Sequence, residues 1–194
     1  MEQKDGFEIV FADTAAAWRA WLLAHHEQDE SVWLVIYKKD SSISSVYYNE
    51  AVDEGLCFGW IDSKPNKRDA DSYYQFFSKR NPKSNWSKVN KDKIERLLAE
   101  GKMHESGLDM VRHAKATDTW DALNDVDNLI VPDDLQAVFD EQPTAFEHWN
   151  AFPPSTRRGI LEWIFNAKRP DTRAKRIREA VEKAAQNIRA NQYR

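Results

Sequence analysis

The hexapeptide VWLVIY at residues 32–37 constrains the fold more than any other segment, because all six positions are apolar or aromatic. Alternate side chains of a strand point to opposite faces of its sheet. A segment that is apolar on both alternations is typical of a central strand covered on both sides. A helix that spans a membrane needs about 20 apolar residues, so this run predicts a sheet core and no membrane span.

The pattern around this strand predicts an α+β protein with a small, mostly antiparallel sheet and helices in its N-terminal part. Apolar residues three or four positions apart predict a helix over 14–26, and a turn with a second strand is expected over 41–48. Further segments complete this part: a helix over 50–56, strands over 58–63 and 72–79, and helices over 91–102 and 107–120.

The C-terminal part is predicted to be all-helical. Pro132 suits a first helical position, and residues 171–189 carry an apolar stripe with helical spacing. We therefore expect an α+β domain over residues 1–124, with its sheet within about 30–80 followed by two helices. A helical region over 125–194 would follow.

The single cysteine, Cys57, excludes a disulfide within the chain and fits a reducing compartment. It lies between Leu56 and Phe58, which is typical of a small, buried, inert side chain. The N-terminus lacks a cationic start followed by an apolar stretch, so no signal peptide is expected, and we expect a cytoplasmic protein. The five histidines show no metal-ligand spacing, so neither a metal nor a cofactor is expected.

Charge alternates in blocks along the chain, although the net charge is only -4. Residues 1–63 carry 4 basic and 12 acidic side chains, and residues 64–102 carry 11 and 5. Residues 103–167 carry 4 and 12, and residues 168–194 carry 9 and 3. The basic segments either lie against acidic ones within the fold or form a basic face that attracts an anion.

The stretch FFSKRNPKSNWSKVNK at residues 76–91 combines five cations with serines, asparagines and a tryptophan, and it contains no acid. Ser87 or Asn90 would cap the helix that follows. A helix N-terminus also favours an anion, and Lys79, Arg80, Lys83 and Lys88 would add positive charge. Trp86 is either a core residue or a stacking platform. The stretch lacks the glycine pattern of a nucleotide-binding loop.

Asp62 ends the short apolar segment that includes GWID at residues 59–62. It would either pair with Arg80 or a nearby lysine or accept a hydrogen bond from a ligand. The predicted ligand-binding set is Asp62, Arg80, Lys83, Ser84, Trp86 and Ser87.

Four segments occur in the order expected of one protein family: EAVDEGLCFGWIDS (50–63), FFSKRNPKSNWSKVNK (76–91), ERLLAEGKM (95–103) and AKRPDTRAKRI (167–177). In these four segments the chain resembles the YdeI/OmpD-associated family, also called the bacteriocin-protection family. The resemblance runs from about Trp18 to Ile188. It implies an α+β N-terminal part, a helical C-terminal part, and an association with tolerance to envelope stress and cationic antimicrobial peptides. It implies no catalytic mechanism.

Three functions remain open. The first is a binding module for a small anionic or polar ligand, held between the sheet and the helix that follows residue 90. The second is an interaction protein that uses basic strips at residues 79–91 and 168–178 on nucleic acid or an acidic partner. The third is an enzyme of unknown reaction that uses Asp62 or Cys57, and it ranks last because no acid, base and nucleophile converge in the sequence.

Overall fold

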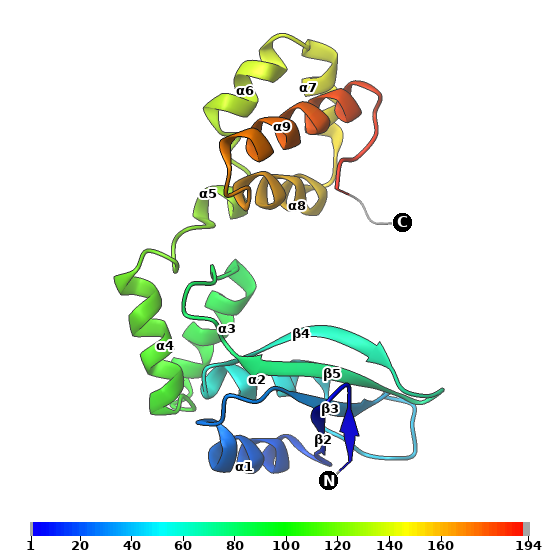
Figure 1. The fold of residues 1–194 in the computed structure, drawn as a ribbon, viewed down its shortest axis with the longest axis vertical. Coiled ribbons are helices and arrows are strands. Elements are labelled where there is room, and N and C mark those ends of the chain that lie inside the picture. Colours follow the sequence, from blue (N-terminus) through cyan, green and yellow to red (C-terminus); the bar gives the residue numbers. More distant parts are fainter. Residues whose placement is uncertain (1, 192–194) are drawn as a thin grey trace. The chain divides into compact units, whose positions relative to one another are not determined.

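The computed structural model describes residues 2–191 and divides the chain into two compact units, Met1–Asp121 and Ala122–Arg194 (Figure 1). The first unit contains a five-stranded sheet with helices, and the second is helical. This arrangement confirms the predicted fold class.

The sheet of the first unit has the strand order β1-β2-β3-β5-β4. Its strands are β1 (Gln3–Lys4), β2 (Phe7–Phe11), β3 (Val32–Tyr37), β4 (Trp60–Lys67) and β5 (Ser72–Lys79). β2 and β3 are parallel, and the other neighbouring pairs are antiparallel. β3 is the middle strand, and its first five residues are buried, as its apolar sequence predicted.

The strand that the sequence predicted over 41–48 does not form. β2 and β5 hydrogen-bond to the two edges of β3, so a further strand has no edge of β3 to join. The segment instead closes as a loop. Ser45 Oγ accepts from the Tyr37 backbone N–H at 2.8 Å, and the Val46 backbone N–H donates to the Ala12 carbonyl at 3.0 Å.

The first unit contains the helices α1 (Ala15–His25), α2 (Tyr48–Cys57), α3 (Lys88–Ala99) and α4 (Glu105–Ala116). Both α3 and α4 pack on α2, which itself contacts β4. Leu34 and Phe77 of the sheet share one core with buried side chains of all four helices. The Trp18 indole N–H donates to the Ala51 carbonyl at 3.1 Å and so joins α1 to α2.

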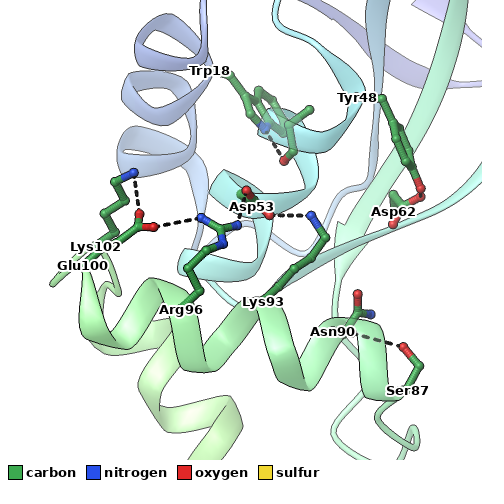
Figure 2. Close-up of polar contacts among 11 residues, drawn as sticks. Trp18, Tyr48, Asp53, Asp62, Ser87, Asn90, Lys93, Arg96, Glu100 and Lys102 are labelled. Atoms are coloured by element: carbon green, nitrogen blue, oxygen red, sulfur yellow. Dashed lines mark hydrogen bonds and ion pairs between the residues drawn. The ribbon is translucent and has the colours of Figure 1, made fainter. Parts of the chain in front are cut away.

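Ion pairs fix α3 against α2. The Asp53 carboxylate contacts Lys93 Nζ at 2.6 Å and Arg96 Nη2 at 2.5 Å (Figure 2). The Asp53 and Lys93 side chains are both largely buried, and an ion pair of this kind is far costlier to break than an exposed one. Two basic residues of α3, Lys93 and Arg96, therefore form ion pairs within the fold.

The opposite face of the sheet carries aromatic rings in place of helices. Trp33 packs edge-on against Phe76, with ring centroids 4.7 Å apart. Lys4 Nζ and Lys64 Nζ lie 5.5 Å and 5.6 Å from the centroid of the Trp33 ring, within the range of a cation–π contact. This face is covered by rings and lysine side chains.

The second unit consists of α5 (Asn124–Asp127), α6 (Asp133–Asp140), α7 (Pro143–Ala151), α8 (Pro154–Phe165) and α9 (Pro170–Ala185). Its own core includes Leu135, Phe139, Trp149 and Val181. His148 Nδ1 of α7 lies 2.8 Å from the Ala184 carbonyl of α9. Within residues 2–191, no helix is both long and apolar enough to cross a membrane.

Candidate functional site

The loop between β5 and α3 is held by its own polar groups. Ser87 is the N-cap of α3, and its hydroxyl accepts from the Asn90 backbone N–H at 3.4 Å (Figure 2). Ser84 Oγ donates to the Asn81 carbonyl at 2.7 Å. Both serines of the predicted site therefore shape the loop, while the Lys83 side chain is exposed.

Arg80 and Trp86 form the buried part of this loop. Trp86 is 2% exposed and belongs to the core of the first unit. The Arg80 guanidinium carbon lies 3.7 Å from the centroid of the Trp86 ring, and Arg80 itself is 6% exposed. Stacking of a guanidinium on an indole is favourable and is stronger away from water.

Arg80 is a buried cation without a carboxylate partner among residues 2–191. Its Nη2 donates to the Asn85 carbonyl at 2.5 Å, and its Nε is buried without a hydrogen-bond partner in that part of the chain. Burial lowers the pKa of Arg80 to about 10. A charge taken from water costs several kcal/mol unless it is paired, so this guanidinium is suited to an anion from outside the chain.

A pocket of about 550 Å³ opens beside Arg80, and we call it the Arg80 pocket. Its lining comes from the end of α1, the turn before β4, the end of β5 and the start of α4: His26, Glu27, Phe58, Gly59, Lys79, Arg80, Asn81, Pro82, Ser106, Asp109 and Met110. Gly59 has φ +77°, and a Cβ there would lie 2.9 Å from Met110 Cγ. The glycine thus allows β4 to begin close to α4.

Ser106 lines this pocket, and His104 packs against two of its lining residues, Phe58 and His26; the sequence did not single out either residue as a site. Ser106 Oγ lies 2.9 Å from His104 Nδ1 and donates to the Phe58 carbonyl at 3.1 Å. The His104 ring stacks on Phe58 at 4.8 Å and contacts His26 edge-on at 4.6 Å. His104 also caps α4, since its ring nitrogen accepts from the Ser106 backbone N–H. Capping is the only signal in the sequence that would have identified the pair.

The charges around the Arg80 pocket are partly used by the chain itself. Lys79 Nζ donates to the Glu27 carbonyl at 2.6 Å and contacts Asp29 at 3.2 Å. The Asp109 carboxylate accepts from Arg112. Arg80 is therefore the cation of this pocket that has no acid beside it within residues 2–191.

Asp62 does not lie at the Arg80 pocket. Its Oδ2 accepts from the Tyr48 hydroxyl at 2.8 Å and from Gln75 Nε2 at 3.3 Å, and Figure 2 shows Tyr48 reaching toward it. Asp62 lines another pocket, of about 440 Å³, with Tyr48, Ser63, Pro65, Tyr73 and Gln75. Burial, followed by the hydrogen bond to Asp62, raises the pKa of Tyr48 to about 12. The residues of the predicted site are thus divided between two pockets, the loop and the core.

The two predicted basic strips also make contacts within the fold. In the first strip, Lys88 pairs with Asp92 at 3.0 Å. In the second, Arg173 donates to both carboxylate oxygens of Asp134, at 2.6 Å and 2.8 Å, and Arg176 donates to the Trp163 carbonyl. The exposed cations of the second strip are Lys168, Arg169, Lys175 and Arg178.

Within residues 2–191, no group of three or more histidine, cysteine, aspartate or glutamate side chains could hold a metal ion. Cys57 is buried, as its neighbours predicted. Asp62 lines a pocket, whereas Cys57 lies in the hydrophobic core of the first unit.

Comparison with known proteins relates each unit to a family. Residues 10–110 match the family model described as Domain of unknown function (DUF8412). Residues 128–187 match the model described as Bacteriocin-protection, YdeI or OmpD-Associated. No curated protein and no solved structure matches the chain. The chain therefore belongs to the DUF8412 domain family through its first unit, and its second unit carries a Bacteriocin-protection, YdeI or OmpD-Associated domain.

Proposed function

We propose that the first unit is a binding module that holds the anionic group of a small ligand in the Arg80 pocket. The observation that carries the proposal is the buried guanidinium of Arg80, which has no carboxylate beside it within residues 2–191 and whose Nε has no hydrogen-bond partner there. Without a ligand the fold bears the cost of that desolvated charge. An anion that accepts from Arg80 would offset the cost, and a charge-assisted hydrogen bond is about twice as strong as a neutral one.

The surroundings of Arg80 define the rest of the ligand. Trp86 supports one face of the guanidinium, and this stacking restricts the orientation of its donor groups. Ser84 and Ser87 would act indirectly by fixing the loop, and Lys83 would add long-range attraction from its exposed position. The Glu27 side of the pocket favours a polar or cationic group at the other end of the ligand. A small carboxylate or phosphate compound with further polar groups fits this lining.

The cellular role that we propose is tolerance to stress or to antimicrobial peptides. It rests on the match of the second unit to the Bacteriocin-protection, YdeI or OmpD-Associated model. In this proposal the first unit senses or carries the small ligand, and the second unit connects the protein to the protective response.

Calorimetric and thermal-shift titration with phosphate, sulfate and small mono- and dicarboxylates tests the proposal. The wild-type protein is expected to gain thermal stability with at least one of them, because a ligand that binds only the folded state stabilises it. Arg80→Gln is expected to weaken that binding about tenfold or more. Arg178→Gln removes an exposed arginine of the second unit and serves as the matched control.

The stability of the free variant separates a ligand role from a structural one. Arg80→Gln removes the desolvation cost of the buried cation together with its stacking on Trp86 and its hydrogen bond to the Asn85 carbonyl. These effects oppose one another, so the variant is expected to unfold close to the wild-type temperature. A lower melting temperature with unchanged anion affinity would assign Arg80 to the scaffold and overturn the proposal. Absence of any stabilisation across the panel would do the same.

A further inference from the structure

The pocket that contains Asp62 has a chemistry opposite to that of the Arg80 pocket. It is lined by one carboxylate, the rings of Tyr48 and Tyr73, and the neutral groups of Ser63, Pro65 and Gln75. A neighbouring pocket of about 420 Å³ shares Tyr48 and Tyr73. The two tyrosines therefore belong to one hollowed surface, where α2 begins beside β4 and β5.

The Asp62 carboxylate lacks a cation within the described residues. Its two hydrogen-bond donors, Tyr48 and Gln75, are both neutral, and both use Oδ2. Oδ1 has no hydrogen-bond partner within residues 2–191. Asp53 provides the contrast within the same unit, because it contacts both Lys93 and Arg96 (Figure 2). The fold neutralises Asp53 internally and leaves Asp62 without a counter-charge.

The two lysines of the hollowed surface, Lys38 and Lys39, contact groups other than Asp62. Lys38 Nζ donates to the Ala70 carbonyl at 2.5 Å, and Lys39 Nζ lies 5.9 Å from the centroid of the Tyr47 ring. Both line the neighbouring pocket and not the one that contains Asp62. The positive charges of Lys38 and Lys39 disfavour a cationic ligand in the neighbouring pocket, so such a ligand would bind in the pocket that contains Asp62.

The tyrosine rings complete the recognition of a cation. A ring face attracts an ammonium group that lies within about 6 Å of its centroid. Burial and then the hydrogen bond to Asp62 raise the pKa of Tyr48 further, to about 12, and its ring is a neutral phenol over the physiological pH range. Oδ1 of Asp62 and the rings of Tyr48 and Tyr73 belong to the lining of one pocket, which thus offers both a hydrogen-bond acceptor and π faces.

We propose that the Asp62 pocket binds a primary alkylammonium group, with Oδ1 of Asp62 accepting from the ammonium and the rings of Tyr48 and Tyr73 contacting its alkyl stem. The group would come from a free amine or from a lysine side chain. The site is separate from the Arg80 pocket and does not depend on the function proposed for it.

Titration of the full-length protein with butylammonium chloride, followed by amide chemical shifts, tests the assignment. Butylammonium is expected to shift the amides of Tyr48, Asp62 and Gln75, while sodium chloride at the same ionic strength leaves them in place. Nα-acetyl-lysine methylamide, which keeps its ε-ammonium group, distinguishes the two sources. An affinity similar to that of butylammonium shows that a lysine side chain enters the site, whereas binding of butylammonium alone assigns the site to free amines. If neither compound shifts these amides beyond the salt control, the proposal is wrong.

Asp62→Asn keeps the size and the acceptor for Tyr48 but removes the charge, and it is expected to weaken binding about tenfold. Asp171→Asn, an exposed site in α9, is the matched control and is expected to bind like the wild type. Tyr48→Phe keeps the ring and is expected to bind within about threefold of the wild type. Equal affinity of Asp62→Asn and the wild type would overturn the assignment of Asp62.

The proposal for the Asp62 pocket and the proposal for the Arg80 pocket can be tested independently. Titration of Arg80→Gln with butylammonium is expected to reproduce the wild-type shifts, whatever the result of the anion panel. If Asp62→Asn does not fold, the shifts of the wild-type amides alone decide the case. Shifts confined to residues outside the Asp62 pocket would then contradict the proposal.

Discussion

Cys57 shows how burial decides the chemistry of a single side chain. It is fully buried in the core of the first unit, and burial raises the pKa of its thiol from 9.0 to about 11. The thiolate is the reactive form of cysteine. Because the folded pKa is the higher one, this group favours folding below pH 9, and that contribution is lost as the pH rises toward 11.

We expect the Cys57 thiol to react with a disulfide reagent such as DTNB at pH 8 far more slowly in the native protein than in the unfolded one. The higher pKa lowers the thiolate fraction, and burial blocks the reagent. Absorbance at 412 nm measures the thionitrobenzoate that the reaction releases. The unfolded chain should release one equivalent, because it has one cysteine. Rapid stoichiometric reaction of the native protein would show that Cys57 is accessible.

At the scale of elements, close approaches of backbone decide where glycine is required. Gly107 lies in α4 against the C-terminal end of α2, and a Cβ at this position would lie 2.2 Å from the Cys57 carbonyl oxygen. Gly159 lies inside α8, and a Cβ there would have no atom within 4 Å. The same substitution therefore meets opposite environments in two helices.

We expect Gly107→Ala to lower the free energy of unfolding of the first unit by about 3 kcal/mol or more, because backbone atoms must move to admit the methyl group. Gly159→Ala should raise it by about 0.5–1 kcal/mol, since alanine is the better helix former. Denaturant unfolding followed by circular dichroism measures both. Equal effects of the two substitutions would contradict the packing of α4 on α2.

Elements with a strong apolar period could be predicted from the sequence, whereas elements defined by their neighbours could not. β3, β5 and α1 follow their patterns. The short β1 and β2 were missed because β1 has only two residues and β2 joins the sheet through long-range pairing with β3. The strand predicted at 41–48 is absent, because β2 and β5 take both edges of β3.

The candidate site was predictable as residue types but not as an arrangement. Arg80 was singled out by charge, and the structure places it beside Trp86. The separation of Asp62 from Arg80 depends on strand register, which pairs Asp62 with Phe77, whereas Arg80 follows the end of β5. Register comes from tertiary pairing. His104 and Ser106 carried only a capping pattern.

At the scale of the whole molecule, each unit has its own core. Leu34 belongs to the core of the first unit and Leu135 to that of the second, and both are fully buried. Units that bury separate cores are expected to open as separate cooperative units. A single free energy of unfolding would then not describe the whole chain.

We expect Leu135→Ala to destabilise the second unit by about 2–5 kcal/mol through the cavity that it creates. Hydrogen exchange should accelerate in α6 to α9 and remain at wild-type rates in β3 and β5. Leu34→Ala is the matched variant for the first unit and should give the reverse pattern. Acceleration of both units by either substitution would show that they unfold together.

The two lysines above the Trp33 ring have a consequence for how this protein behaves at high concentration. A sheet face that carries aromatic rings and no helix of the first unit would otherwise offer an apolar surface to the sheet of another molecule. Ammonium groups from Lys4 and Lys64 hold water over those rings, since a lysine head group stays hydrated while its stem covers apolar surface. The hydrated charges of the two lysines therefore oppose association of this face with the same face of a second molecule.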